Sequence, residues 1–164
     1  MTEIHAVVIT ASDARARGER EDKSGELLVE LLTATGAQII AKEILNDDLE
    51  PLADKIREYA DRPEVNLLVT TGGTGFGPRD NTPEATLRVI ERAAPGLAEA
   101  MRMETLNITP MAMISRGVCG IRSGCLIINL PGSPKAVRES FEVIQPVLHH
   151  AIGLLAGTSR SHNG

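Results

Sequence analysis

Short apolar runs rich in Val, Ile and Leu alternate with segments typical of helices along most of this chain. Strands are predicted at residues 4–10, 37–45, 66–70, 118–122 and 125–130. Helices are predicted at residues 24–35, 48–61 and 97–106, after residue 82, and from residue 133 towards the C-terminus. Strands that alternate with helices favour an α/β fold. We therefore expect a single three-layer domain over residues 1–156, with a mainly parallel sheet and helices on both faces. Residues 157–164 are expected to form a disordered tail.

The predicted helices have recognisable starts and stops. Side chains suited to cap a helix N-terminus stand before several of them, at Ser24, Asp48, Thr82 and Ser133. Thr82 and Ser133 are each followed by proline, which is favoured at the first helical position. Pro146 is expected to kink or break the last helical region. The strands at 118–122 and 125–130 are expected to pair as a hairpin.

The most informative segment is the glycine-rich loop at residues 72–81, which follows the buried strand at 66–70. Its glycines leave backbone amides bare at the carboxyl end of a strand, where open α/β sheets bind ligands. Bare amides followed by a helix N-terminus suit a phosphate group. We assign nucleotide binding to Gly72, Gly73, Thr74, Gly75 and Arg79. The alternative is a purely structural turn.

This loop matches neither of the common phosphate-binding patterns. It is not a Walker A loop, because no Gly-Lys-Ser/Thr follows. Counted from Gly73, the last glycine of a G-x-G-x-x-G pattern is replaced by Pro78. The nucleotide assignment therefore depends on the glycines together with the charged residues Arg79 and Asp80 that follow them.

Acidic residues follow two of the predicted strands at the same edge of the sheet. Asp80 closes the glycine-rich loop, and Asp47 and Asp48 follow the strand at 37–45. Mg²⁺ takes oxygen donors and is often shared with substrate phosphates. We assign Asp47 and Asp80 as catalytic and metal-binding residues, with Asp48 as a helix cap. The alternative for Asp80 is a cap or a salt bridge with Arg79.

Two more loops are expected at this edge. Ser12 and Asp13 follow the first strand, and a tight turn follows the strand at 125–130. A polar ligand at the helix N-terminus after that turn is expected, although capping alone would explain Ser133. The residues assigned to substrate binding are Ser12, Asp13, Pro131, Gly132 and Ser133.

Charge and composition exclude several classes of function. The net charge is −5, and the most basic stretch, residues 15–23, is interleaved with acidic residues. Duplex nucleic acid is therefore not expected as a partner, and this stretch is interpreted as a solvated mixed-charge loop. The histidines form no catalytic spacing with a nucleophile. No apolar run is long enough to span a membrane, and no signal peptide is recognised, so a cytoplasmic protein is expected.

Several separate motifs resemble the molybdopterin adenylyltransferase family, which includes the G domain of gephyrin. The family signature is an apolar strand, Thr, one residue, Gly-Gly-Thr-Gly, four residues and Asp, and residues 70–80 match it. Further similar segments are found at residues 12–13, 22–25, 82–86, 115–122 and 127–136. The resemblance covers residues 9–136, which is most of the chain.

This resemblance implies a specific reaction. Members of the family transfer AMP from ATP to the terminal phosphate of molybdopterin with magnesium, release pyrophosphate, and pass the product to a molybdenum-inserting protein. Two aspartates matter in the family, and they are matched here by Asp80 and by Asp47. Asn46 stands where the family often has proline, so the second aspartate could instead be Asp48. Family members are commonly trimers, and some relatives are hexamers, so a homotrimer is expected.

Two other functions are compatible with the resemblance. The chain could be a paralogue that binds molybdopterin without catalysis, since fold alone does not decide activity. It could also be a nucleotide pyrophosphatase of the competence-damage type, although the glycine-rich loop of that group differs after its third glycine. The presence of both aspartates, Asp47 and Asp80, favours the transferase.

Overall fold

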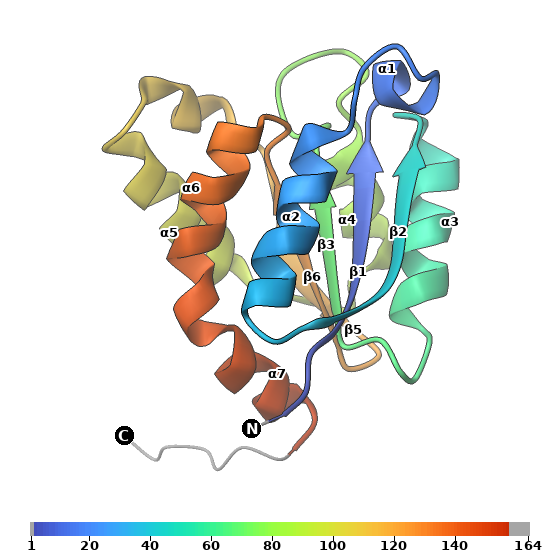
Figure 1. Ribbon diagram of the computed structural model, residues 1–164, viewed down its shortest axis with the longest axis vertical. Coiled ribbons are helices and arrows are strands. Elements are labelled where there is room, and N and C mark those ends of the chain that lie inside the picture. Colours follow the sequence, from blue (N-terminus) through green and yellow to red (C-terminus); the bar gives the residue numbers. More distant parts are fainter. Residues whose placement is uncertain (1, 158–164) are drawn as a thin grey trace.

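A six-stranded sheet forms the centre of the molecule in a computed structural model that describes residues 2–157 (Figure 1). Its strand order is β2-β1-β3-β6-β5-β4. The strands are β1 (His5–Ala11), β2 (Gln38–Leu45), β3 (Leu67–Thr71), β4 (Arg92–Ala93), β5 (Cys119–Arg122) and β6 (Cys125–Leu130). The first four in spatial order run parallel, whereas β5 and β4 are antiparallel to their neighbours. The predicted mainly parallel sheet and the predicted hairpin of β5 and β6 are both confirmed.

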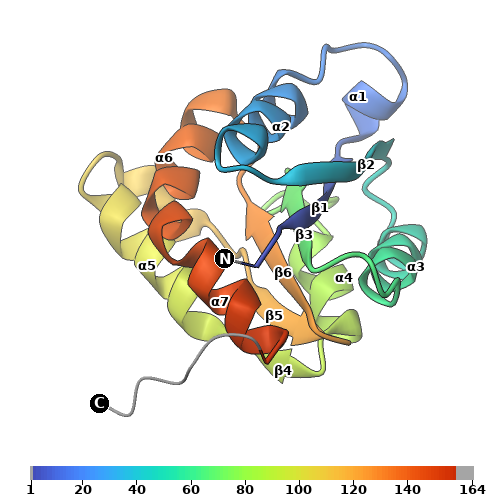
Figure 2. The ribbon, with the colours of Figure 1, turned by 60° about the horizontal axis from the view of Figure 1, so that its bottom comes forward.

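Helices cover both faces of the sheet, as Figures 1 and 2 show. They are α1 (Asp13–Ala16), α2 (Lys23–Ala34), α3 (Leu49–Ala60), α4 (Thr82–Val89), α5 (Pro95–Leu106), α6 (Pro134–Ile144) and α7 (Leu148–Leu155), with 3-10 turns η1 (Pro110–Ile114) and η2 (Gln145–Val147). One apolar core lies between the sheet and α2, α5, α6 and α7, and the other lies under α3 and α4. The predicted three-layer α/β fold is therefore confirmed.

The parallel strands bring their carboxyl ends to one edge of the sheet. Thr71 at the end of β3 is level with Thr10 of β1 and with Leu130 of β6. Ala11 is level with Leu45 at the end of β2. The loops that follow these strands therefore meet at one edge, which is where ligands bind in sheets of this type.

Buried polar side chains connect the sheet to its covering helices. Asn129 of β6 donates from Nδ2 to the hydroxyls of Thr70 and Thr86, at 3.0 Å each. Its Oδ1 accepts from the backbone N–H of Val118 at 3.2 Å. Because a buried polar group is costly unless it is hydrogen-bonded, this network fixes how β3, β6 and α4 pack.

Two of the predicted helix caps, Ser24 and Thr82, are wrong, and a third, Asp48, is right only in its position. Asp22, not Ser24, caps α2, because its side chain accepts from the Gly25 amide. Asp48 stands at the N-cap of α3 but its side chain makes no capping bond. Thr82 lies inside the first turn of α4 and donates its hydroxyl to the Gly72 carbonyl, so it ties down the glycine-rich loop instead.

Other local predictions hold. Ser133 caps α6, where its side chain accepts from the Ala136 amide. The helical region breaks at η2 around Pro146, as its ring requires. The short elements α1, β4 and η1 were not predicted, because each is too short to carry a periodic pattern. The predicted disordered tail at 157–164 lies, apart from Gly157, outside the described residues. Within residues 2–157, no helix combines the length and the hydropathy that a membrane span requires.

Candidate functional site

The glycine-rich loop turns sharply at its first two residues. Gly72 and Gly73 have φ of +94° and +68°, a region that favours glycine. A Cβ at Gly72 would lie 2.4 Å from the carbonyl oxygen of Ala11. The Gly72 amide donates to the Leu130 carbonyl at 3.2 Å. The loop is therefore pressed between the ends of β1 and β6, and only glycine fits at this point.

The next amides of this loop are available to a ligand. Among the described residues, the backbone N–H groups of Gly73, Thr74 and Gly75 have no hydrogen-bond partner. In contrast, the carbonyls of Gly73 and Thr74 accept from Thr82 and Arg116. The loop thus uses its carbonyls to hold its shape and presents its amides outward, as an anion-binding loop requires.

Arg116 holds the loop from the far side, and sequence reasoning missed this role. Its Nε donates to the Gly75 carbonyl at 2.7 Å and its Nη2 to the Asp80 carbonyl at 2.8 Å. It also forms an ion pair with Glu84 of α4, and this pair lowers the pKa of the Glu84 carboxyl. The only available signal was its position in a segment that resembles the family, where no role was assigned to it.

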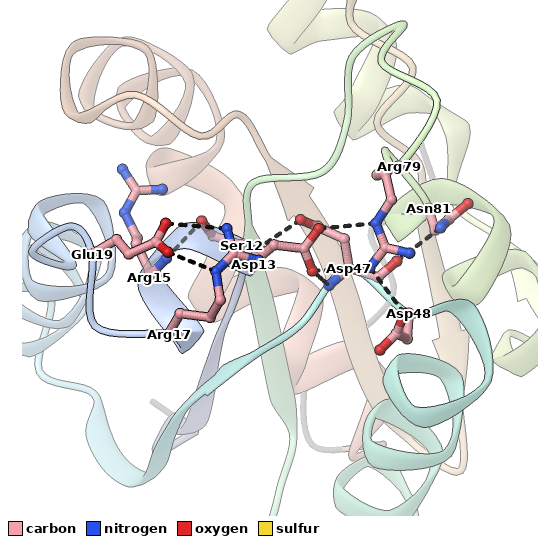
Figure 3. Close-up of polar contacts among 9 residues, drawn as sticks. All are labelled: Ser12, Asp13, Arg15, Arg17, Glu19, Asp47, Asp48, Arg79 and Asn81. Carbon is pink, nitrogen blue, oxygen red and sulfur yellow. Dashed lines mark hydrogen bonds and ion pairs between the residues drawn. The ribbon is translucent and has the colours of Figure 1, made fainter.

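Asp47 and Asp13 bind each other through reciprocal hydrogen bonds (Figure 3). Asp47 Oδ2 accepts from the Asp13 amide, and Asp13 Oδ1 accepts from the Asp47 amide, at 3.0 Å each. Asn81 donates to the Asp47 carbonyl at 2.8 Å. The loops after β1, β2 and β3 are thereby locked together, and the Asp47 carboxylate is held in one orientation.

The remaining oxygen of Asp47 is buried without a partner. Asp47 Oδ1 has no hydrogen bond to any described residue, and it lies 3.2 Å from the position of a Cβ built on Gly73. Burial raises the pKa of the Asp47 carboxyl, and the nearby charges of Asp13 and Asp80 act in the same direction. A buried acceptor that is repelled by other carboxylates is suited to a cation.

Asp80 faces the same space from the other side of the loop. Its Oδ2 accepts from the Gly77 amide at 2.8 Å, so the loop bends back onto its own closing residue. The predicted alternative of an Asp80–Arg79 salt bridge is not found among the described ion pairs. Asp80 and Asp47 both line one cavity at the sheet edge.

Arg79 turns away from that cavity into an ion-pair network (Figure 3). Its guanidinium donates two bonds of 2.9 Å to the Asp13 carboxylate and one of 2.9 Å to Asp48. This pairing, together with the bond from the Asp47 amide, lowers the pKa of Asp13 to about 2. Asp13 and Arg79 therefore serve to position the loops in this structure, and Asp48 is occupied as a partner of Arg79.

Two adjoining cavities flank the glycine-rich loop. The central cavity, of about 370 Å³, is lined by Ala11, Ser12, Arg15, Arg20, Asp47, Gly72, Gly73, Asp80, Gly132 and Ser133. The apolar cavity, of about 390 Å³, shares Gly73, Asp80, Gly132 and Ser133 with it and extends between α5, η1 and α6. Its other walls include Ala98, Met101, Met111, Ala112 and Ile114, along with Thr74, Gly75 and Pro131.

The structure thus brings together most of the predicted site. All predicted residues except Asp13 and Arg79 line one or both cavities. Sequence reasoning missed Arg15 and Arg20, which line the central cavity, and the apolar residues of α5 and η1. Ser12 also caps α1, where its hydroxyl accepts from the Arg15 amide at 3.2 Å.

The donor set fits a magnesium ion that is shared with phosphates. Within the described part of the chain, no group of three or more His, Cys, Asp or Glu side chains could hold a metal by itself. Mg²⁺ is usually held by one or two carboxylates together with substrate phosphates and water. Asp47 with its unpartnered oxygen, and Asp80 across the central cavity, meet that requirement.

Comparison with known proteins gives a consistent result. Residues 7–150 match a family model described as "Probable molybdopterin binding domain". The chain is 40% identical over 159 residues to a molybdopterin adenylyltransferase of Helicobacter pylori, covering 96% of this chain and 90% of that protein. It is 42% identical over 150 residues to the Drosophila melanogaster molybdenum cofactor synthesis protein cinnamon, covering 90% of this chain and 25% of that longer protein.

Solved structures agree. The molybdopterin biosynthesis enzyme MoaB from Thermus thermophilus is 45% identical and superposes with a TM-score of 0.88, over 94% of this chain and 97% of that one. The Mog protein from Mycobacterium ulcerans is 37% identical with a TM-score of 0.86, over 93% of this chain and 99% of that one.

Proposed function

Because this chain belongs to the molybdopterin-binding domain family that its residues 7–150 match, we propose that it is a molybdopterin adenylyltransferase. It transfers AMP from ATP to the terminal phosphate of molybdopterin and releases pyrophosphate, as a step of molybdenum cofactor biosynthesis. Bacterial relatives that match it over most of their length carry this name. The observation that carries the proposal is the central cavity, where Asp47, Asp80 and the unbonded amide of Gly73 converge.

The reaction needs positioning and charge neutralisation more than a protein nucleophile. An oxygen of the terminal phosphate of molybdopterin attacks the α-phosphorus of ATP, and the bond from that phosphorus to the bridging oxygen of the β-phosphate breaks. The amides of Gly73, Thr74 and Gly75 bind phosphate oxygens, and Arg116 keeps those amides in place. No Ser, Cys or His nucleophile is required, since the substrate phosphate is the nucleophile.

Asp47 and Asp80 are the residues that would hold magnesium. The Asp13 amide orients one oxygen of Asp47 and leaves the other, Oδ1, without a hydrogen-bond partner among the described residues, in a residue that lines the central cavity. The Gly77 amide orients Asp80 in the same way from the glycine-rich loop. When bound, the ion supplies positive charge to the phosphates. Burial raises the pKa of Asp47, the charges of Asp13 and Asp80 add to this effect, and a bound cation would favour the ionised carboxylate.

The apolar cavity fits the organic part of molybdopterin. It opens from the central cavity at Gly73, Asp80, Gly132 and Ser133, and its far walls are mainly methionine, alanine and isoleucine side chains. Substrate sites commonly combine such apolar walls with a few polar groups. In this assignment Pro131, Gly132 and Ser133 contact molybdopterin, and its terminal phosphate reaches the central cavity past Ser133, at the N-terminus of α6.

Assembly and location follow from the family by the same reasoning. We propose a homotrimer of domains that span residues 1–156, working in the cytoplasm and passing the adenylylated product to a molybdenum-inserting protein. Exposed apolar side chains near α5 and η1 support self-association, since monomers rarely expose so many together. Those that do not line the apolar cavity are Met103, Leu106, Ile108 and Met113.

The decisive experiment is incubation with ATP, magnesium and molybdopterin, followed by mass analysis of the products. Adenylylated molybdopterin with one pyrophosphate per turnover is the expected result. Binding of molybdopterin without a new product would instead identify a binding paralogue. Release of AMP and pyrophosphate from ATP without molybdopterin would identify a nucleotide pyrophosphatase.

A further inference from the structure

A third cavity lies beside the central one and carries a concentration of positive charge. It has a volume of about 380 Å³ and is lined by Arg15, Arg20, Glu21, Lys23 and Pro134. Arg15 and Arg20 line the central cavity as well, so the two spaces adjoin through these side chains. We call this space the basic cavity. Its charge is unusual for a chain whose net charge is −5.

Arg15 is held in place at the boundary of the two cavities. Only 14% of its side chain is exposed, and Asp22 Oδ1 lies 3.9 Å from its Nε. Nε donates to the Glu21 carbonyl at 3.3 Å, and Nη2 lies 3.5 Å from the Gly132 carbonyl. The Arg15 side chain therefore connects the loop after α1 to the loop before α6. These contacts hold its guanidinium group in position before any ligand binds.

Asp22 is the buried anchor of this arrangement. Its side chain is only 4% exposed, and it accepts from the Thr10 hydroxyl at 2.9 Å and the Gly25 amide at 3.1 Å. Lys42 Nζ of β2 lies 3.1 Å from Asp22 Oδ2, the oxygen that also accepts from Thr10. A Cβ at residue 25 would lie 2.2 Å from this carboxylate, which explains the glycine there. A buried carboxylate with this many partners is a built feature, not a chance surface contact.

Arg20, Glu21 and Lys23 differ from Arg15, Arg17, Glu19 and Asp22 of this segment, whose side chains are paired. Arg17 forms an ion pair of 2.9 Å with Glu19 (Figure 3). Within residues 2–157, the side chains of Arg20 and Lys23 take part in no ion pair or hydrogen bond. The interpretation of residues 15–23 as a solvated mixed-charge loop therefore holds for its exposed side chains, Arg20 and Lys23 included, and fails for Arg15 and Asp22, which are largely buried.

We propose that the basic cavity binds the β- and γ-phosphates of ATP and receives them as pyrophosphate. This inference rests on the proposed adenylyl transfer. In such a transfer the attacking and leaving oxygens lie on opposite sides of the phosphorus. The apolar and basic cavities both adjoin the central cavity, and no residue lines both of them. A molybdopterin phosphate that enters from the apolar cavity expels the leaving group away from itself, towards Arg15, Arg20 and Lys23.

The chemistry of these side chains suits that leaving group. The bridging oxygen leaves the α-phosphorus with its electron pair and remains on pyrophosphate, so no external acid, oxidant or reductant is needed. Arg binds phosphate oxygens with paired N–H donors, and Lys adds a compact positive charge. Since Arg20 and Lys23 have no intramolecular partner among the described residues, they can turn towards the phosphates without breaking an existing contact.

The test compares three variants of the full chain by titration calorimetry with pyrophosphate and, separately, with AMP, both with magnesium. Arg20→Gln and Lys23→Gln should each weaken pyrophosphate binding about tenfold and leave AMP binding unchanged. Arg17→Gln is the matched control, because it removes the same charge from the same loop outside the cavity. It should leave pyrophosphate affinity within about twofold of wild type. Equal losses of pyrophosphate affinity in all three variants would show that only the net charge of the protein matters, and would overturn the proposal. A wild-type protein that binds no pyrophosphate would overturn it as well.

The outcome separates this inference from the function on which it rests. If pyrophosphate binding depends on Arg20 and Lys23 but no adenylylated molybdopterin is formed, the phosphate subsite stands and the transferase assignment fails. If turnover is normal in Arg20→Gln and Lys23→Gln, with unchanged KM for ATP, the enzyme assignment stands and the subsite is excluded.

Discussion

The side chain of Asp47 accepts a hydrogen bond from the Asp13 amide, and the side chain of Asp13 accepts one from the Asp47 amide, at 3.0 Å each. This reciprocal pair joins the loop after β1 to the loop after β2. Asp13 uses its two oxygens to hold Arg79 as well, whereas Asp47 keeps Oδ1 buried and unpartnered. Two aspartates in contact thus have different roles, because their surroundings differ.

Replacement of either cavity aspartate should abolish most of the activity. Asp47→Asn and Asp80→Asn keep side-chain shape and remove a charge from the place where magnesium and phosphates are proposed to bind. Loss of such a charged group raises the activation free energy by several kcal/mol, which lowers the rate about a hundredfold or more. Rates of adenylyl transfer would be measured, and molybdopterin affinity should change much less.

Asp48→Asn is the control for this pair. Asp48 is adjacent in sequence but its side chain is half exposed and pairs with Arg79 outside the central cavity. It should retain near-normal turnover. Normal rates in both Asp47→Asn and Asp80→Asn would refute the catalytic assignment, and an inactive Asp48→Asn beside an active Asp47→Asn would move it by one residue.

Asp47→Asn should also keep or increase the stability of the fold. Burial and neighbouring carboxylates raise the pKa of Asp47, so the folded state disfavours its charged form. That cost is present above the raised pKa and is relieved as pH falls through it. A neutral Asn removes this cost at about neutral pH. Thermal melting without ligands checks this, and a clear loss of stability would indicate that Asp47 is structural.

The outline of the fold could be predicted from sequence because the strands are apolar and the helix signals are local. Ser133 illustrates this, since its cap depends only on the residues that follow it. The cap of α2 could not be predicted, because the burial of Asp22 depends on Thr10 and Lys42 from two strands. Arg79 shows the same limit: beside the glycine-rich loop it resembles a phosphate ligand, but Asp13 and Asp48 from other loops bind it.

Gly73→Ala should weaken ATP binding through a direct clash at the site. A Cβ there would lie 2.4 Å from the Thr82 hydroxyl and 3.2 Å from Asp47 Oδ1, at a φ of +68°. The loop must shift, and both its amides and Asp47 shift with it. Gly124→Ala is the matched control, since its φ is +78° and its Cβ would contact nothing within 4 Å.

Both substitutions should lower the melting temperature, because each places a side chain in the left-handed region at a cost of about 1–2 kcal/mol. Only Gly73→Ala should weaken the binding of magnesium-ATP in calorimetry. An equal effect of both variants on ATP affinity would show that the change reflects general destabilisation.

The Asp13–Arg79 pair should make stability depend on pH in the acidic range. The Arg79 guanidinium lowers the pKa of Asp13 from an ordinary value of 3.8 to about 2. A lowered pKa means that the pair stabilises the fold above the unfolded value and that this contribution is lost as pH falls towards 2. Denaturant unfolding of wild type and Asp13→Asn should therefore differ near neutral pH and converge below the folded pKa. A difference that stays constant across this window would mean that the ionised carboxylate is not the stabilising group.

Arg116→Lys should slow adenylyl transfer without removing a charge. The guanidinium binds the Gly75 carbonyl, the Asp80 carbonyl and the Glu84 carboxylate at once, and an ammonium cannot span all three. The glycine-rich loop then loses the clamp that aims its amides. Because Arg116 positions the loop, Arg116→Lys should lower kcat by about tenfold or more, since a small misplacement of reacting groups slows the reaction strongly. Arg122→Lys supplies the comparison, because Arg122 makes similar forked bonds to Asp61 but its hydrogen bonds go to Asp61 and Val89, outside the glycine-rich loop. Both variants should lose some thermal stability, and only Arg116→Lys should lose turnover. If the two variants lose kcat equally, Arg116 contributes only to folding.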